Sequence, residues 1–322
     1  MALSTHQVEV VEIKELLPHP NADKLAIVPI WEYRVCVDKT QWKVGDLAAY
    51  IVPDSIVDTS RPEFSFLSSG HIKVKKLRGQ ISQGLLVPAP AGAKVGDNVA
   101  SLLGVTRYEP VVHGMKEEDN EDTSGPLGWC PKYDVENFYR YSRLFVQGEP
   151  VQVTEKVHGA NARYTFANGT MYVGSRTRWK KENERNDWWV ALYATPTLKE
   201  WCEAHPGHVV YGEVYGAVKG FRYGVEGRRF AAFDIWDMQV GCWLNAEEAR
   251  AIAPNIPWVP LLENHYPFDL DKLKEMAEGP SVFPNAQHIR EGIVVKPMME
   301  RQDSRFGRVC LKIVGNGFLL TK

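Results

Sequence analysis

The chain has 322 residues, of which 44% are hydrophobic and 24% charged, and its formal net charge is −2. This length suffices for two domains with separate cores, and the near-neutral charge excludes a protein that is basic over its whole surface, so any nucleic-acid-binding surface must be local. Apolar runs are too short to span a membrane and the first residues lack the pattern of a secretory signal, so we expect no membrane association.

Five cysteines are scattered along the chain without a Cys-x-x-Cys pair: Cys36, Cys130, Cys202, Cys242 and Cys310. This spacing argues against a zinc site and against a disulfide framework, and it suits the reducing cytosol. We therefore expect a cytoplasmic protein without zinc. We also expect a monomer, although this does not follow from the cysteines.

Residues 1–110 have the pattern of a small all-β domain. Segments rich in β-branched residues alternate with clusters of proline, glycine, asparagine and aspartate, which is typical of short strands joined by turns. The expected strands are Val8–Ile13, Leu25–Val37, Leu47–Val52, Ile72–Leu77 and Gly84–Val87. This arrangement predicts a small OB-like β-barrel.

Residues 111–130 separate this domain from the rest of the chain. They include an acidic run without aromatic residues, GMKEEDNEDTSG at 114–125. Such a composition is typical of an exposed or mobile segment, so we expect an acidic linker here.

Residues 131–322 predict a second domain of the α+β class, because expected strands alternate with expected helices. The strands are Val151–Lys156, Ala162–Phe166, Met171–Val173, Val209–Tyr215, Phe230–Trp236, Gly292–Lys296 and Val309–Val314. The helices are Asn186–Ala194, Leu198–Ala204, Ala246–Ala251 and Leu270–Ala277, with Asp269 as the expected N-cap of the last.

Two basic clusters in this domain are interleaved with aromatic residues that could stack on bases. The first contains Arg176, Arg178, Lys180, Lys181 and Arg185, and the second contains Lys219, Arg222, Arg228 and Arg229. The alternative is a solvated basic face with half-buried tryptophans, which we prefer for these clusters taken alone.

The segment from Thr154 to Asn161, TEKVHGAN, places Lys156 between an expected strand and the turn at Gly159. At such a junction the amine would lie at the edge of a pocket, where it could act as a nucleophile. An ordinary lysine has a pKa near ~10.4, so desolvation, a neighbouring cation or a metal would have to lower the pKa. Alone, this short motif fits better an edge-strand lysine followed by a turn.

Further charged and aromatic side chains lie beside apolar strands of the same domain. Glu213 follows Gly212, where the backbone can approach a ligand closely. The others are Phe233, Glu291, Lys296 and Lys312. Each fits a structural role when taken singly. Together they supply a nucleophile, two carboxylates for a metal, cations for phosphates and an aromatic ring for a purine, which are the parts of a nucleotidyl-transfer site.

The metal of such a site would be magnesium or a similar divalent ion. Magnesium binds carboxylates together with phosphate oxygens, which favours Glu213 and Glu291 as its ligands. The sequence contains no GxxxxGK[ST] loop, which disfavours phosphoryl transfer of the P-loop type.

The order of these motifs resembles the covalent nucleotidyltransferase superfamily of ligases and capping enzymes. The motifs are Glu-Lys-x-His-Gly-x-Asn from Glu155, Ser-Arg-Thr, Tyr-Gly-Glu, Phe-Asp-Ile, Glu-Gly-Ile-Val-Val-Lys and Leu-Lys-Ile. DNA ligases typically have aspartate at the position of His158. A histidine at this position resembles the RNA ligase branch that is related to phage double-strand RNA ligases. Segments Pro18–Leu25, Leu77–Leu86 and Asp134–Asn137 resemble the subfamily with an OB domain before its ligase domain. The resemblance implies an ATP-grasp-like adenylyltransferase domain at 131–322.

This resemblance implies an ATP-dependent RNA ligase that uses Mg²⁺ or Mn²⁺. Lys156 would attack the α-phosphate of ATP and carry AMP covalently. The AMP would move to a 5′-phosphate, and a 3′-hydroxyl would then attack that end and seal the strand at a nick. The expected partner is RNA or an RNA-containing duplex, which the amino-terminal barrel would help to grip.

The family's site residues carry over by motif match. Catalytic roles would fall on Lys156, His158, Arg176 and Lys312. The nucleotide would be held by Glu155, Asn161, Glu213, Phe233, Glu291, Lys296 and Lys312. Within this set Glu155 and Phe233 would hold the adenine, and Lys312 the α-phosphate. His158 would matter more for the later steps than for lysine adenylylation.

One position departs from the family pattern. The last motif commonly has two lysines, but Val314 stands at the second position. Lys296 or Arg308 could supply the missing cation, or the site could use fewer cations.

Two alternatives remain open. One is a GTP-using capping-type nucleotidyltransferase, against which His158 and the short stretch after Val314 count. The other is a tRNA- or RNA-binding module with an inactive rear domain, because the segment from His19 to Leu25 also occurs in OB-type tRNA-binding domains. An inactive domain would be expected to have lost Lys156, Glu213 or Glu291, and all three are present.

Overall fold

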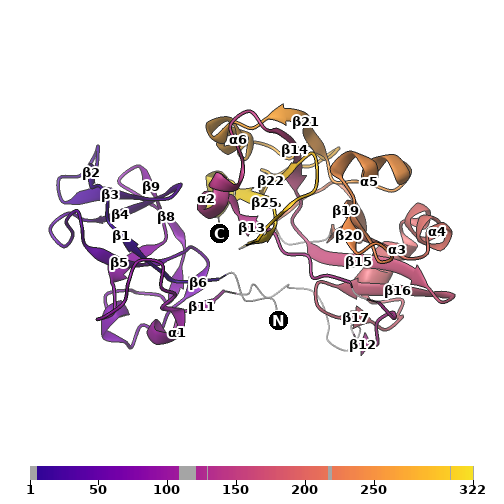
Figure 1. The fold of residues 1–322 in the computed structure, drawn as a ribbon, viewed down its shortest axis with the longest axis horizontal. Helices are drawn as coiled ribbons and strands as arrows, with labels where there is room; N and C mark the ends of the chain where they lie inside the picture. The colour runs from indigo at the N-terminus through magenta and orange to yellow at the C-terminus, as the bar shows by residue number, and fades with distance from the viewer. Residues whose placement is uncertain (1–5, 109–120, 129, 217–219, 305, 322) are drawn as a thin grey trace. The chain divides into compact units, whose positions relative to one another are not determined.

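A computed structural model describes residues 6–108, 121–128, 130–216, 220–304 and 306–321 (Figure 1). Contacts between Cα atoms divide the chain into two compact units, residues 1–111 with 319–322, and residues 112–318. Lys219 of the second basic cluster and most of the acidic run at 114–125 lie outside the described residues. No helix of the described residues is both long and apolar enough to cross a bilayer.

The first unit consists of short antiparallel strands. One sheet contains β1 (Glu9–Glu12), β5 (Leu47–Ile51) and β10 (Leu85–Pro88), and a second contains β2 (Leu17–Pro18), β3 (Leu25–Ile30) and β4 (Tyr33–Asp38). A third contains β11 (Thr106–Arg107), β6 (Ser55–Ile56) and β7 (His71–Ile72), and β8 (Val74–Leu77) pairs with β9 (Gln80–Gln83). The helices are η1 (Pro62–Phe64) and α1 (Ala100–Leu103). Apolar side chains such as Val10, Ile51, Phe64 and Val87 form the core.

Two predicted strands of this unit are divided in the structure. The segment Leu25–Val37 forms two strands, β3 and β4, which reverse direction at Trp31. Trp31 has φ of 51°, a left-handed conformation that is rare for a residue other than glycine, asparagine or aspartate. Tryptophan is not typical of such a turn, so the sequence pattern predicts one continuous strand here. The segment Ile72–Leu77 is likewise shared between β7 and β8.

The second unit contains two larger sheets. The first has the order β12 (Asp122–Thr123), β17 (Trp179–Lys180), β16 (Thr170–Ser175), β15 (Ala160–Ala167), β18 (His208–Tyr215), β19 (Arg229–Asp237) and β20 (Cys242–Trp243). The second has the order β13 (Glu136–Asn137), β25 (Leu311–Val314), β22 (Gly292–Pro297), β14 (Pro150–Lys156) and β21 (Leu261–Pro267). A separate hairpin contains β23 (Gln302–Asp303) and β24 (Gly307–Arg308).

Helices cover one face of the seven-stranded sheet: α3 (Asp187–Tyr193), α4 (Pro196–Ala204) and α5 (Ala246–Ile252) (Figure 1). Their apolar residues, including Leu192 and Leu198, pack on Tyr164 and Phe230 of the sheet. The remaining helices are α2 (Phe138–Tyr141), η3 (Ser142–Leu144), α6 (Leu270–Met276) and α7 (Asn316–Leu319). As expected, Asp269 caps α6, because its side chain accepts from the backbone N–H groups of Asp271 and Lys272.

Strand alternation gives each sheet one polar face. On the five-stranded sheet, Glu155 shares the apolar face with Ile293 and Ile313, whereas Lys156, Lys296 and Lys312 point to the opposite face. On the seven-stranded sheet, Asn161 of β15 pairs with Glu213 of β18 on the face away from the helices. These two polar faces carry the candidate site.

Candidate active site

The Glu291 carboxylate joins two residues of the Lys-x-His-Gly motif. Its Oε1 lies 2.8 Å from Lys156 Nζ, and its Oε2 lies 2.9 Å from His158 Nδ1. Lys156 ends β14 and Glu291 immediately precedes β22, and these strands pair with Lys156 opposite Gly292. The predicted nucleophile and one predicted metal ligand are therefore in direct contact.

The pKa of Lys156 is raised in the free protein, whereas the sequence led us to expect that the site lowers it. Burial acts to lower the pKa of Lys156, but the Glu291 and Glu213 carboxylates outweigh burial and hold the pKa above its ordinary value. Lys156 in turn holds the pKa of the buried Glu291 below its usual range, although burial alone would raise it. In the free protein the pair is a lysine cation and a carboxylate.

Glu213 is the second carboxylate near Lys156. Burial raises the pKa of Glu213 to about 8, with Lys156 opposing and Glu291 adding to the rise. At neutral pH the free protein therefore keeps most of Glu213 protonated. A positive charge beside Glu213 and Glu291 would favour the ionised form of both, as a metal ion does.

Asn161 supplies a polar atom without a partner. Its Oδ1 is buried and makes no hydrogen bond to any described residue. Because its register partner across the strands is Glu213, this amide oxygen lies on the face that carries the second carboxylate. Buried polar groups are normally hydrogen-bonded, so a bare buried oxygen here suits a ligand group or its water.

Close backbone approach explains the glycine of the motif. A Cβ on Gly159 would lie 2.1 Å from the carbonyl oxygen of Val214, which leaves no room for a side chain. A Cβ on Gly292 would lie 1.9 Å from the carbonyl oxygen of Ile313. Both glycines therefore allow strands to meet beside Lys156 and Glu291.

His158 is held by Phe221 and Tyr223, two of the aromatic residues interleaved with the second basic cluster, which the sequence suggested as stacking partners for bases. Its ring stacks on Phe221, with centroids 4.0 Å apart and planes at 13°. Its backbone N–H donates to the Tyr223 hydroxyl at 2.8 Å. No local pattern connects these residues to His158, because Phe221 and Tyr223 lie more than sixty residues from His158 in sequence.

Phe233 lies at a bulge of β19. Tyr211 of β18 is opposite Asp234, and Gly212 is opposite Ala232, so Phe233 is the additional residue between them. One side of its ring contacts Tyr133, with centroids 4.3 Å apart. Phe233 is only partly buried, which leaves it suited to stacking on a base.

Lys296 and Arg308 are both committed to the buried Asp234. Lys296 Nζ donates to Asp234 Oδ1 at 2.7 Å, and Arg308 binds Asp234 Oδ2 at 3.0 Å. The Tyr133 hydroxyl also donates to Asp234. Lys296 further donates to the carbonyl oxygen of Phe233 at 2.9 Å. The two cations considered as substitutes for a lysine at Val314 thus form an ion cluster behind Phe233.

Glu155 is separated from the other predicted site residues by strand alternation. Its carboxylate accepts hydrogen bonds from Ser281 Oγ at 2.6 Å and from the backbone N–H of Val282 at 2.7 Å. It is 1% exposed and lies on the face opposite Lys156. Lys312 lies on the Lys156 face, opposite Val294 of β22.

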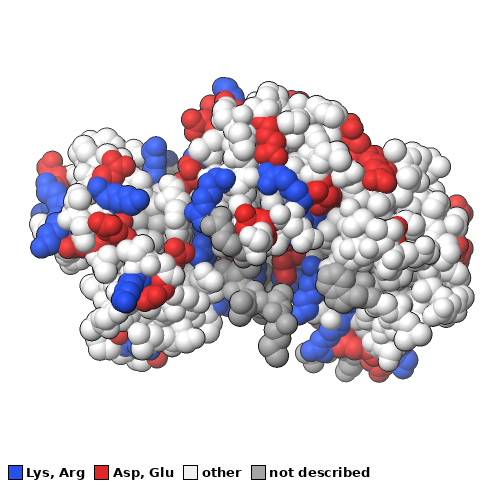
Figure 2. Space-filling view, in the orientation of Figure 1, with Lys and Arg blue, Asp and Glu red and all other residues white. Residues whose placement is uncertain are grey.

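The first basic cluster is largely neutralised by acidic residues of 121–134. The ion pairs are Arg176 with Asp134, Arg178 and Lys180 with Asp122, and Lys181 with Glu121. In the second cluster, Arg228 pairs with Asp187. These ion pairs favour the interpretation of solvated, ion-paired faces for the two clusters. Figure 2 shows Lys and Arg side chains close to Asp and Glu side chains at several places on the visible face.

The residues of this site suit a metal ion that is bound partly by the protein and partly by the substrate. Among the described residues, no group of three or more His, Cys, Asp and Glu side chains is placed to hold a metal ion. Magnesium is usually bound by one or two carboxylates together with substrate phosphates. Glu213, Glu291 and the bare Oδ1 of Asn161 fit that kind of site.

Two family models match this chain. The RNA ligase family matches residues 149–314, and an OB-fold domain family matches residues 7–89. No curated protein sequence matches the chain.

Several solved structures of Naegleria gruberi RNA ligase share the fold over nearly the whole chain. A single-residue variant with ATP and Mn is 24% identical with a TM-score of 0.81, covering 98% of both chains. The ligase with pyrophosphate is 24% identical, and another variant with AMP and Mn is 23% identical; each has a TM-score of 0.80 and covers 98% of both chains. The predicted fold, an OB-like domain followed by an α+β ligase domain, is confirmed.

The family match extends over more than half of the chain and includes Lys156, Glu213 and Glu291. The prediction of an RNA ligase is thereby confirmed, and this chain belongs to the RNA ligase family.

Proposed function

We propose that this RNA ligase uses ATP to join a 3′-hydroxyl and a 5′-phosphate at a nick in an RNA-containing duplex, with AMP carried on Lys156. The observation that carries the proposal is the contact of Lys156 with Glu291, which also binds His158 and lies near Glu213. The ATP, AMP and Mn found with the similar Naegleria ligase support the choice of nucleotide and metal.

Glu213 and Glu291 would hold the divalent metal, with Asn161 Oδ1 as a partner for the metal or its water. When bound, the metal supplies positive charge that offsets the two carboxylates and the phosphate oxygens. With the carboxylates offset in this way, burial remains as the effect that acts on Lys156, and burial lowers the pKa of a lysine. The amine can then lose its proton and become a nucleophile.

In the first step Lys156 Nζ forms a bond to the α-phosphorus of ATP. The bond from that phosphorus to the bridging oxygen breaks, pyrophosphate leaves, and the amine releases its proton to solvent. Phe233 would stack on the adenine, and Lys312 and Arg176 would stabilise the charge on the phosphates. For Arg176 this requires release from Asp134, which lies 2.9 Å away and is half exposed.

In the second step an oxygen of the RNA 5′-phosphate attacks the phosphorus of the AMP, and the bond to Lys156 breaks as the amine regains a proton. In the third step the 3′-hydroxyl oxygen forms a bond to the phosphorus of the adenylylated 5′-phosphate and releases its proton to solvent, the bond from that phosphorus to the AMP oxygen breaks, and AMP leaves. His158 would serve these later steps, because it binds the far oxygen of Glu291 rather than Lys156 itself.

The test is incubation of the purified protein with α-labelled ATP and magnesium, followed by a denaturing gel and intact mass. We expect a covalent AMP adduct on the wild type, none on Lys156→Ala, and an unchanged adduct on Lys199→Ala. Lys199 is the matched control because it is an exposed lysine on α4. A nicked RNA duplex added to the adenylylated protein should then be sealed.

Other outcomes would decide against the proposal. An adduct with GTP but not with ATP would favour the capping-type alternative. No adduct with either nucleotide, after treatment with pyrophosphate to remove bound AMP, would leave the RNA-binding alternative.

A further inference from the structure

The β8–β9 hairpin of the first unit concentrates positive charge. Residues 70–84 include Lys73, Lys75, Lys76 and Arg78 but no aspartate or glutamate. Elsewhere in the same unit, acidic and basic residues are interspersed along the chain. The hairpin is therefore a local basic surface on a protein whose net charge is slightly negative.

All four of these cations are exposed to solvent. Lys75, Lys76 and Arg78 are exposed, and none forms an ion pair with any residue that the structure describes. The basic residues at 176–181 differ in this respect, because acidic side chains neutralise them. An exposed, unpaired cation can bind an external anion without first breaking an internal ion pair.

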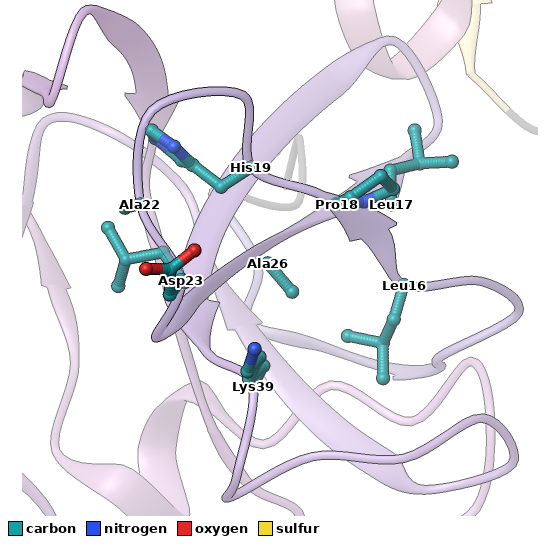
Figure 3. Close-up of a pocket in the computed structure, with 9 residues that line it drawn as sticks. Leu16, Leu17, Pro18, His19, Ala22, Asp23, Ala26 and Lys39 are labelled. Atoms are coloured by element: carbon teal, nitrogen blue, oxygen red, sulfur yellow. The ribbon is translucent and has the colours of Figure 1, made fainter.

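The turn that presents Arg78 is held by the loop between β2 and β3, on which Figure 3 shows His19. His19 Nδ1 accepts from the backbone N–H of Asn21, so its Nε2 carries the proton and donates to the carbonyl oxygen of Leu77 at 3.1 Å. Asn21 Nδ2 donates to the carbonyl oxygen of Arg78 at 3.0 Å. This gives a structural role to the segment Pro18–Leu25, which the adenylylation site does not use.

The turn itself requires this support. Arg78 and Gly79 have φ of 46° and 91°, a left-handed pair that suits a tight hairpin but costs free energy at Arg78. The hydrogen bonds from His19 and Asn21 hold the carbonyl oxygens of Leu77 and Arg78 in place at this turn. The hairpin is therefore a fixed arm, and its cations keep their positions when no ligand is bound.

The arrangement of the charges suits an extended polyanion. Lys75 and Lys76 are neighbours on a strand, so their side chains point to opposite sides of β8, while Arg78 lies at the tip. Three cations spread over roughly 10 Å of strand do not converge on one small anion. Residues 73–80 contain no aromatic side chain to stack on bases, which favours contact with phosphates rather than with bases.

We infer that the β8–β9 hairpin is a phosphate-binding arm that grips the backbone of the RNA substrate through Lys75, Lys76 and Arg78, independently of sequence. This inference rests on the proposed function, since it takes the RNA to be sealed as the ligand. The arm acts on RNA binding and sealing, and it contributes nothing to the formation of lysyl-AMP.

The test compares two triple variants that remove the same charge from the same unit. The arm variant is Lys75→Ala/Lys76→Ala/Arg78→Ala, and the control variant is Lys14→Ala/Lys43→Ala/Lys94→Ala, whose three lysines are all exposed. Affinity for a labelled RNA duplex with one nick is measured over a range of salt concentrations. A third variant, Lys75→Arg/Lys76→Arg/Arg78→Lys, keeps the charge.

The arm variant should bind the duplex at least about tenfold more weakly than the control variant at low salt. Its slope of log K against log salt should be shallower by about 2 to 3, as expected for three lost phosphate contacts. The charge-keeping variant should bind like the wild type, and all variants should form lysyl-AMP normally.

Equal affinity and equal salt slope in the two triple variants would overturn the inference. Loss of lysyl-AMP formation in the arm variant, with its thermal unfolding unchanged, would also overturn it, because the hairpin would then act on the nucleotide. Failure of the proposed function is distinguishable, because the wild type itself would then form no lysyl-AMP.

Discussion

Lys156 and Glu291 form an ion pair, with Nζ 2.8 Å from Oε1, so the proposed nucleophile of this ligase contacts the carboxylate that is proposed to bind its metal. The pair keeps Lys156 protonated in the free protein, because Glu291 and Glu213 together raise the pKa of its amine against the effect of burial. In the proposed mechanism, activation of the lysine and occupation of the metal site are coupled, because a positive charge that offsets Glu291 also removes the main cause of the raised pKa of Lys156.

Glu291→Gln should lower the pKa of Lys156 in the free protein. The amide keeps the shape of the side chain but removes its charge, and an opposite charge at this distance shifts a pKa by about 1–3. The measurement is the pH dependence of chemical labelling of Lys156, read by mass spectrometry. The labelling midpoint should fall by about one pH unit or more. An unchanged midpoint would mean that Glu291 does not control this lysine.

The same substitution should nevertheless slow the formation of lysyl-AMP by about 100-fold or more. Loss of a single electrostatic contact in an active site commonly costs ~10²–10³ in rate, and Glu291 is one of two predicted metal ligands. Normal adenylylation by Glu291→Gln, measured with α-labelled ATP at saturating magnesium, would exclude Glu291 from the metal site.

His158→Ala should impair sealing more than adenylylation. His158 binds Glu291 Oε2 and stacks on Phe221, whereas Glu291 Oε1 remains available to Lys156. We expect lysyl-AMP formation to fall by less than about tenfold, and sealing of a nicked RNA duplex by about 100-fold or more, a loss typical of a general acid–base group. Equal losses in the two assays would contradict this division of roles. Phe221→Leu is the control for lost stacking.

Glu213→Gln should change how stability depends on pH. The pKa of Glu213 in the folded protein is raised to about 8, above the value near ~4.3 in an unfolded chain. The folded state therefore binds the proton more tightly, and the wild type loses stability as pH rises from about 4.3 through about 8. The variant lacks this loss, so its melting temperature should gain on that of the wild type between pH 5 and pH 8. A constant difference would contradict the raised pKa.

Much of the second unit could be predicted from the sequence, because its elements have strong local signals. The predicted helix Asn186–Ala194 corresponds to α3, for which the Asn186 side chain forms the N-cap. The predicted strand Val151–Lys156 corresponds to β14. The strand periodicity also placed Lys156 at a strand end beside Gly159, where the structure has it.

What the sequence did not predict depends on contacts between distant residues. By motif, Lys296 is expected to bind the nucleotide and Arg308 is an alternative cation for its phosphates, but both pair with Asp234, which lies more than sixty residues from either. The position of Glu155 could have been inferred, because adjacent strand residues point to opposite faces. The carboxylate partners of Lys156 raise its pKa, and no local pattern shows which of several acids will meet a lysine.

Gly159→Ala should disrupt the site without a change of charge. The added Cβ would lie 2.1 Å from the carbonyl oxygen of Val214, so β15 and β18 would have to separate beside Glu213. We expect lysyl-AMP formation to be lost. The control is Gly169→Ala, where nothing lies within 4 Å and only φ of 73° is unfavourable, a cost of about 1–2 kcal/mol. Normal adenylylation by Gly159→Ala would contradict the close approach seen here.

Asp234→Ala should destabilise the second unit, because it leaves two buried cations without their carboxylate. Lys296 is 2% exposed and Arg308 also binds this carboxylate, and removal of one partner from a buried ion pair costs about 3–5 kcal/mol. Urea denaturation checks this loss, with the exposed pair of Glu247 and His265 as the control: Glu247→Ala should cost less than about 1 kcal/mol. The two cations hold the pKa of Asp234 below its usual value, although burial alone would raise it. The stability that Asp234 contributes is therefore complete above about pH 4 and is lost as pH falls below that value. If the two variants unfold at the same urea concentration, the cluster behind Phe233 contributes nothing to the fold.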